Sequence, residues 1–280
     1  MAGLLRSLLD PVDKDHPDSV DPALVAALAR PFRRFGRVWY RLEQEGVEHL
    51  PSGPALIVGN HNSGTAFLEA LSAGAGIAEE HPLTGLAHDA VVDAPLFGRL
   101  LVRVGAVRAS YDAAEVAFGQ GRKVVVFPGG NREAFRPWRH RHRVDFGGHR
   151  GFVRLALRHS VDIVPWVLHG GHSGFVVVDD GRGVARQLGA DRWLRSSTWP
   201  LMLGLPWGVA LGPWPHLPLP VKVRARFFPP VRLGGYGPED ADDERVVRAL
   251  YHEVQERLQV GLDELVREAR SARWRWLDRR

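Results

Sequence analysis

The stretch ALIVGNHNSGTAFLEA, residues 55–70, indicates how this chain folds. It begins with the apolar run 55–58, which is typical of a strand buried on both faces. A short polar turn, residues 59–61, ends that run, and an apolar pattern of helical spacing starts at Ala66. A buried strand that passes through a turn into a helix is the unit from which parallel α/β sheets are built.

The same order of elements recurs along the chain. A second buried strand, Lys123 to Phe127, runs into Pro128-Gly129-Gly130, and a third spans Ile163 to Leu168. The sequence therefore predicts an α/β fold with a largely parallel central sheet flanked by helices. Further strands are expected at 85–92, 106–109 and 222–228, and further helices at 65–78, 95–102, 111–120 and 152–159.

The ends of the chain add two helices to this core. Residues 21–45 interleave arginines with aromatic residues, so they predict either a membrane-surface helix or a helix packed on its own domain with an arginine-rich outer face. A long C-terminal helix with an apolar stripe is expected from Glu239 to about Trp276. We therefore divide the chain into an N-terminal tail and membrane-facing helix at 1–45, a core at 46–235, and a C-terminal helix packed on the core at 236–280.

Composition limits the chemistry that is open to this chain. Among its 280 residues there is no cysteine, which excludes disulfides, thiolate zinc sites and cysteine nucleophiles. The net charge is +5, and nearly all of the positive charge is arginine. Arginine suits phosphate on anionic lipid, CoA or nucleic acid, although a bias in codon usage would also enrich it. No nucleic-acid-binding motif is present, so we expect no nucleic-acid partner.

Residues 196–221 form an unusual segment without any Asp, Glu, Lys or Arg. Its length approaches that of a membrane span, but its six prolines would break a spanning helix repeatedly. Its tryptophans are the residue type that settles at bilayer interfaces. We interpret this segment as re-entrant or interfacial, or as an irregular wall of an apolar pocket.

Two turns carry the candidate chemistry, and both follow buried strands. Sites in sheets of this kind lie beyond the carboxyl ends of the strands, so both turns are expected at one edge. In the first turn, a neutral His61 could take a proton from a hydroxyl group. In the second, FPGGNREAF at 127–135, two glycines would let the backbone approach a ligand, and Arg132 lies at a helix start that favours anions. The histidines at 140, 142 and 149 lie among arginines that would repel a cation, so no metal site is expected.

Taken together, these blocks resemble the lysophospholipid and glycerolipid acyltransferase superfamily over roughly residues 35–235. That family carries an N-H-x4-D block after a strand, an F-P-E-G-T-R block and a later V-P strand. The matching segments here are Asn60-His61, the turn 127–132 and Val164-Pro165. The Gly105 to Arg108 turn is similar to the second block, and residues 150–156 are similar to a further helical block.

The resemblance implies an acyltransferase that moves a fatty acyl group from acyl-CoA to a hydroxyl of a glycerolipid or lysophospholipid, with His61 as general base. The family's aspartate falls on Ala66 here, so another acid would have to orient the imidazole. Glu69 is our first candidate for that catalytic partner, with Asp89 and Asp93 as alternatives. Without such an acid, the chain would be a non-catalytic lipid-binding relative. A third possibility is a lipid esterase that uses water activated by His61.

The P-G-G form of the second turn resembles the branch that contains monoacylglycerol and diacylglycerol acyltransferase-like proteins. The resemblance implies that Arg132, aided by Arg108, binds phosphate, either of the acceptor or of CoA. Backbone amides near Gly129-Gly130, or near the helix start after His61, are expected to stabilise the oxyanion. The expected substrate-binding residues are Asn60, Arg108, Gly129, Gly130, Asn131, Arg132 and Glu133. No cofactor or metal is expected beyond acyl-CoA as a co-substrate. The expected location is the cytoplasm, at the periphery of the membrane.

Overall fold

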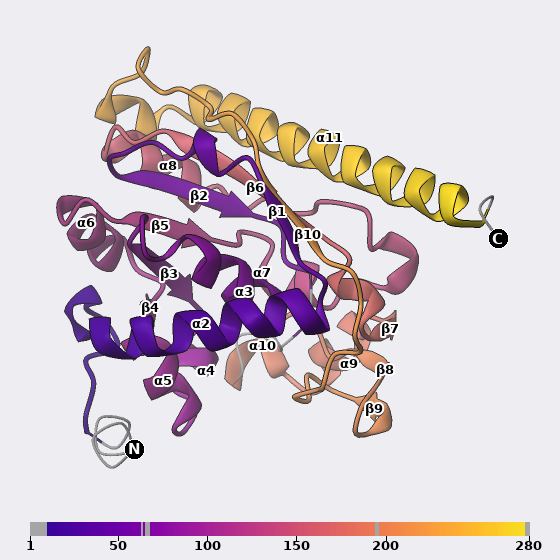
Figure 1. The fold of residues 1–280 in the computed structure, drawn as a ribbon. Helices are drawn as coiled ribbons and strands as arrows, with labels where there is room; N and C mark the ends of the chain where they lie inside the picture. Colours follow the sequence, from indigo (N-terminus) through magenta and orange to yellow (C-terminus); the bar gives the residue numbers. More distant parts are fainter. Residues whose placement is uncertain (1–9, 63, 65–67, 194–195, 278–280) are drawn as a thin grey trace.

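The computed structural model describes residues 10–62, 64, 68–193 and 196–277 of the chain. A seven-stranded sheet forms its centre, in the order β1-β10-β6-β2-β5-β3-β4 (Figure 1). Five neighbouring strands are parallel: β2 (Ala55–Gly59), β3 (Leu83–Ala87), β4 (Ala106–Arg108), β5 (Lys123–Val126) and β6 (Ile163–His169). The expected α/β fold with a largely parallel central sheet is confirmed.

One edge of the sheet departs from this parallel order. β10 (Arg224–Phe227) pairs antiparallel with β6, and β1 (Glu43–Glu45) pairs parallel with β10. The expected helix 21–45 is therefore too long: α2 (Pro22–Trp39) ends before Arg41, whose φ of 45° is incompatible with a continuing α-helix. The chain then enters the sheet, so the segment assigned to the N-terminal tail supplies an edge strand of the core.

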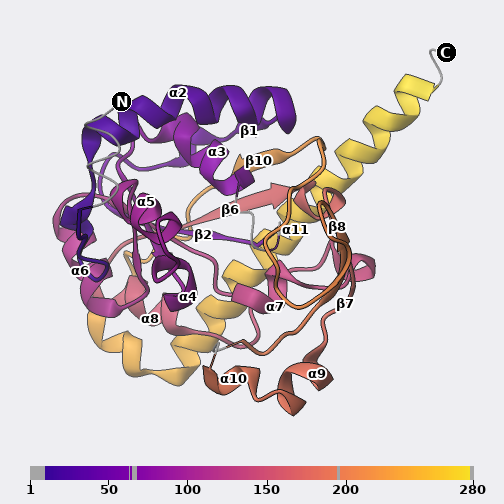
Figure 2. The same ribbon diagram turned by 90° about the horizontal axis from the view of Figure 1, so that it is seen from below.

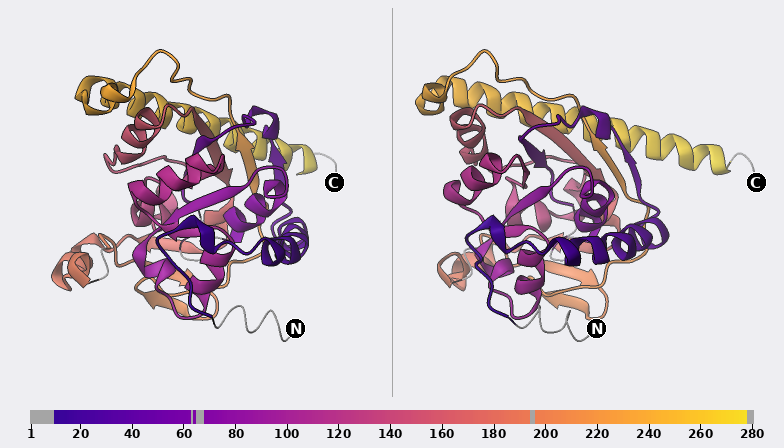
Figure 3. Two further views of the ribbon diagram at one scale, coloured as in Figure 1. Left: turned by 90° about the vertical axis from the view of Figure 1, so that its left-hand side faces the viewer. Right: turned by 60° about the vertical axis from the view of Figure 1, so that its left-hand side comes forward.

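Helices cover both faces of the sheet (Figure 2). Alternate side chains of β2 point to opposite layers: Leu56 and Val58 pack with α6 (Tyr111–Gly119), α8 (Gly151–Arg158) and α11, whereas Ala55 and Ile57 pack with α3 (Leu68–Ile77). α2 lies against α3, so it packs on its own domain, as one of our two interpretations held. The C-terminal helix α11 (Glu244–Leu277) packs along β6 and extends beyond the sheet (Figure 3).

A second, three-stranded antiparallel sheet contains β7 (Val176–Asp179), β8 (Leu201–Gly204) and β9 (Gly208–Leu211). The charge-free segment 196–221 therefore folds largely as a β-hairpin, which our sequence interpretation did not foresee. Short strands were missed because prolines interrupt their apolar pattern. No helix in the part of the chain that the structure describes is long and apolar enough to cross a membrane.

Short helices complete the chain. The expected strand 85–92 ends at Ala87, because His88 accepts a hydrogen bond from the Ala90 N–H and caps a helical turn, α4. The remaining α-helices are α4 (Asp89–Val92), α5 (Phe97–Arg103), α7 (Gly130–Ala134), α9 (Arg182–Gln187) and α10 (Ala190–Trp193). The 3-10 helices are Pro17–Ser19, Val47–His49, Trp138–His140, Gly171–Ser173 and Pro238–Asp242.

Candidate active site

The carboxyl ends of three parallel strands bring the candidate residues together. His61 follows β2, Phe127 follows β5 and His172 lies in the turn after β6. The rings of His61 and Phe127 are 5.1 Å apart between centroids, and His172 lies close enough for its charge to interact with that of His61. The two turns that the sequence placed at one edge of the sheet are therefore in contact.

Asn60 joins the ends of β2 and β6. Its side-chain amide donates to the Leu168 carbonyl oxygen at 2.9 Å, and its side-chain oxygen accepts from the Leu168 N–H at 2.8 Å. The residue is fully buried. These contacts make Asn60 a structural residue rather than the substrate ligand that we expected.

The backbone of His61 is held from both sides by a buried ion pair. Its N–H donates to Oε2 of Glu133 at 3.0 Å, and its carbonyl oxygen accepts from Nη2 of Arg136 at 2.6 Å. Glu133 and Arg136 also pair with each other at 3.0 Å. Glu133 is fully buried, and its carboxylate contacts the Asp145 N–H and Arg136, so these contacts give no support to its expected role as a substrate ligand, which stays a prediction.

The environment of His61 keeps its imidazole neutral. Burial lowers the pKa of the imidazole, and the positive charge of Arg136 lowers it further, to about 3. Only 9% of the residue is exposed. At neutral pH the ring therefore has a nitrogen lone pair that can accept a proton.

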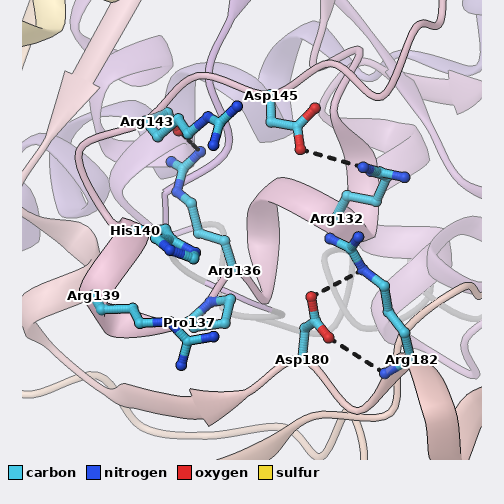
Figure 4. A pocket seen from close by; sticks show the side chains of 9 residues that line it. All are labelled: Arg132, Arg136, Pro137, Arg139, His140, Arg143, Asp145, Asp180 and Arg182. Carbon is cyan, nitrogen blue, oxygen red and sulfur yellow. Dashed lines mark hydrogen bonds and ion pairs between the residues drawn. The ribbon is translucent and has the colours of Figure 1, made fainter.

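An arginine-rich pocket of about 240 Å³ opens beside this ion pair (Figure 4). Arg136 belongs both to the pocket wall and to the support of His61. Two aspartates offset part of the positive charge, because Asp145 pairs with Arg132 at 3.3 Å and Asp180 pairs with Arg182 at 2.9 Å. The remaining lining residues are Pro137, Arg139, His140 and Arg143. The excess of guanidinium groups suits an anionic ligand such as a phosphate.

The P-G-G turn provides the first residues of α7. Arg132 lies in α7 and its guanidinium faces the pocket, as its expected phosphate-binding role requires (Figure 4). The Asn131 side chain donates to Oγ of Ser196 at 3.2 Å, which ties the turn to the charge-free segment. Gly130 adopts a φ of 48°, and its N–H donates to the Phe127 carbonyl oxygen at 3.0 Å. The Gly130 amide is therefore engaged within the turn and is not the oxyanion donor that we expected there.

Arg108 lies elsewhere. It is the last residue of β4, the strand at the far edge of the sheet, where it pairs with Asp15 at 2.7 Å, Asp89 at 2.9 Å and Asp93 at 3.1 Å. Three carboxylates offset its charge and it does not line the arginine pocket, so these contacts give no support to its expected phosphate-binding role, which stays a prediction. The same ion pairs place Asp89 and Asp93 beside Arg108 rather than as partners of His61.

The acid that would orient His61 is not settled by these contacts. Glu69 belongs to α3, directly after the polar turn, but its side chain is not among the described ones. Ala66 lies outside the described residues. Glu69 therefore stays a sequence-based prediction.

Sequence reasoning missed Arg136 and His172. Arg136 is one of many arginines in the stretch 132–143, and only the tertiary structure shows that it is 5% exposed and faces the backbone of His61. His172 belongs to the glycine-rich stretch 170–174, which does not match the G-x-S-x-G spacing of a serine nucleophile elbow. Its ring is buried, and burial lowers its pKa well below the ordinary value, with the charges of Arg136 and His61 adding to the effect.

Comparisons with known proteins agree with this arrangement. A family model described as "Acyltransferase" matches residues 41–169, which include the His61 turn, α7 and Arg136. The uncharacterised protein Rv0502 of Mycobacterium tuberculosis is 32% identical over 272 residues, covering 95% of this chain and 73% of that protein. The "DGAT1/2-independent enzyme synthesizing storage lipids" of Gallus gallus is 27% identical over 130 residues, 46% of this chain and 39% of that protein.

The fold also matches a solved structure. The 1-acyl-sn-glycerophosphate acyltransferase PlsC from Thermotoga maritima superimposes with a TM-score of 0.52 at 18% identity, covering 94% of this chain and 87% of that one. A histidine at the end of a parallel strand, beside an arginine pocket, is the site that this fold presents. The chain belongs to the same family as the mycobacterial protein Rv0502, and its residues 41–169 match the acyltransferase family model. The likeness to PlsC is one of fold.

Proposed function

We propose that the protein is an O-acyltransferase that moves a fatty acyl group from acyl-CoA to a hydroxyl of a glycerolipid or lysophospholipid, with His61 as general base. The observation that carries this proposal is the position of His61. It is a neutral imidazole at the carboxyl end of β2, in a backbone that Glu133 and Arg136 hold on both sides. A neutral imidazole at this position has a nitrogen lone pair that can take the proton of the acceptor hydroxyl.

The proposed reaction needs one proton acceptor, His61, and one thioester, acyl-CoA. His61 takes the proton of the acceptor hydroxyl while the oxygen attacks the thioester carbonyl carbon. Collapse of the resulting oxyanion breaks the carbon–sulfur bond, and the departing CoA thiolate takes the proton back from His61. Backbone N–H groups close to Gly129 would stabilise the oxyanion.

The arginine pocket is the proposed phosphate site. Arg132 faces the pocket, and Arg139 and Arg143 have no ion-pair partner among the described residues, which leaves their charge available to a ligand. Acyl-CoA carries phosphates, and so do lysophospholipid acceptors. The P-G-G turn and the likeness to the Gallus gallus enzyme favour an uncharged acceptor, such as a monoacylglycerol or diacylglycerol. We therefore propose that the arginine pocket binds the phosphates of CoA.

We further propose that the protein works at the periphery of a membrane on the cytoplasmic side. The segment 203–219 has eight exposed large apolar side chains: Leu203, Leu205, Trp207, Val209, Leu211, Trp214, Leu217 and Leu219. Exposed apolar side chains gathered in one segment mark a protein or membrane contact. It adjoins α2, because the Trp39 indole donates to the Pro218 carbonyl oxygen at 3.0 Å, and exposed arginines of α2 would meet anionic headgroups.

The proposal is tested by acyl transfer. Purified protein is incubated with labelled acyl-CoA and separate pools of lysophospholipid, monoacylglycerol and diacylglycerol. We expect a labelled acylglycerol or phospholipid from the wild type, a loss of at least about 100-fold in His61→Ala, and no loss in the exposed control His252→Ala. Binding of lipid without any product would favour the non-catalytic relative, whereas release of free fatty acid without an acceptor would favour the esterase.

The identity of the orienting acid has its own test. If Glu69 orients His61, Glu69→Gln loses most of the activity. If Glu69→Gln retains full activity, that role is wrong.

A further inference from the structure

Glu133 and Arg136 hydrogen-bond to the backbone of His61, one on each side. The His61 N–H donates to Glu133, and the His61 carbonyl oxygen accepts from Arg136. Both partners are almost completely buried, so neither carries a charge toward the solvent. These two hydrogen bonds fix the peptide planes before and after His61. The orientation of the two planes sets the direction in which the imidazole points at the end of β2.

The same ion pair links three segments around the site. Oε1 of Glu133 accepts from the Asp145 N–H at 3.0 Å, and Nη1 of Arg136 donates to the Arg143 carbonyl oxygen at 2.6 Å. α7, the turn after β2 and the pocket wall at 143–145 are therefore held in one network. Four hydrogen bonds and one ion pair restrain this network, which suits a group that must be placed within fractions of an ångström.

The location of the Glu133 carboxylate explains why residue 129, the first glycine of the P-G-G turn, has no side chain. A Cβ atom built on Gly129 would overlap Cγ of Glu133 and lie 2.5 Å from its Oε2. The carboxylate of Glu133, four residues further along the chain, therefore fills the space beside residue 129. The F-P-E-G-T-R block that this turn resembles has its glutamate at the position of Gly129.

We propose that Glu133 and Arg136 are positioning residues for His61, and that Glu133 supplies from α7 the carboxylate for which position 129 has no room. The inference rests on the proposed function, since it assigns His61 the work of a general base. The positioning of the His61 backbone does not depend on the proposed function, because it is measurable without any substrate.

The decisive experiment moves the carboxylate from position 133 to position 129. We would prepare Glu133→Gln, Glu133→Ala, Gly129→Glu and the double variant Gly129→Glu/Glu133→Ala. Gly129 has a φ of −69° and a ψ of −20°, which a glutamate adopts without strain. The matched control is Glu244→Gln, which removes a carboxylate that binds Arg150 and Arg154 between α8 and α11.

We expect Glu133→Gln and Glu133→Ala to lower kcat by about tenfold to 100-fold while KM changes less than about threefold, because the substrate never touches residue 133. Gly129→Glu alone should unfold at lower temperature than the wild type, since two carboxylates would compete for one space. The double variant should recover at least about tenfold in kcat over Glu133→Ala. Glu244→Gln should retain the wild-type kcat.

Amide hydrogen exchange at His61 is the readout that needs no activity. Its protection should fall in Glu133→Ala and return in the double variant. Wild-type kcat in a folded Glu133→Gln, unchanged protection in Glu133→Ala, or a double variant that is unfolded or no better than Glu133→Ala would each overturn the inference. If the wild type transfers no acyl group at all, the proposed function is at fault, and the exchange measurement still decides the positioning role.

Discussion

The side chain of Asn60 and the backbone of Leu168 exchange two hydrogen bonds, although 108 residues separate them in the sequence. They join the end of β2 to the end of β6 directly before His61. The geometry of the candidate base therefore depends on a contact between strands that are neighbours only in the folded sheet.

Replacing Asn60 by alanine should destabilise the protein rather than weaken substrate binding. The Leu168 N–H and carbonyl oxygen would be left buried without a partner, at a cost of about 1–3 kcal/mol each. Urea unfolding measures the change, and KM should stay within about twofold of the wild type, because these groups do not meet the substrate. Asn131→Ala, which removes one half-buried hydrogen bond to Ser196, is the control and should lose less stability. Equal stability of Asn60→Ala and the wild type would contradict this assignment.

The pH dependence of activity should lack the acid limb that histidine usually produces. The pKa of His61 is lowered to about 3, so the neutral, proton-accepting form persists as the pH falls from 8 to 5. We expect kcat/KM, which reports the free enzyme, to stay flat over that range. Circular dichroism at each pH checks that the protein remains folded. A limb near pH 6.5 in folded protein would show that the His61 pKa is not lowered.

Removing arginines from the pocket should weaken binding without slowing the chemical step. Arg132→Ala and Arg143→Ala each delete a charge-assisted contact, so KM for the phosphorylated ligand should rise about tenfold or more while kcat changes little. Arg245→Ala, an exposed arginine of α11, is the control. Initial rates with acyl-CoA and acceptor varied separately show which ligand is bound. If KM for both substrates is unchanged in both variants, the pocket does not hold phosphate.

The exposed apolar side chains of the segment 203–219 should determine binding to vesicles. Trp207 and Trp214 are each more than half exposed, with ring centroids 6.1 Å apart. Indole rings settle at the bilayer interface, so Trp207→Ser/Trp214→Ser should reduce co-sedimentation with vesicles of anionic phospholipid by about tenfold or more. Tyr236→Ser, an exposed aromatic on another part of the surface, should bind like the wild type. Equal binding of the double variant would exclude the hairpin as the membrane contact.

Much of the fold could be predicted because local patterns determine it. The apolar runs that became β2, β5 and β6 are buried on both faces, and only parallel strands between helical layers require that pattern. The errors lie where prolines interrupt the pattern, as in the hairpin 201–211, or where a turn changes the direction of the chain, as at Arg41. At these points, contacts distant in sequence outweigh local preference.

The sequence by itself determined the α/β class, the two polar turns and the edge of the sheet that they share, because topology places the ends of parallel strands side by side. Only the tertiary structure decided what the charged residues do there. Glu133 and Arg108 looked like ligands in the sequence, yet one is fully buried against the His61 backbone and the other is neutralised by three aspartates. The role of a charged side chain depends on its burial and on its nearest opposite charge. The opposite charge of Glu133 is local, Arg136, but its contact with His61 spans 72 positions of the sequence, and Arg108 reaches Asp15 across 93 positions.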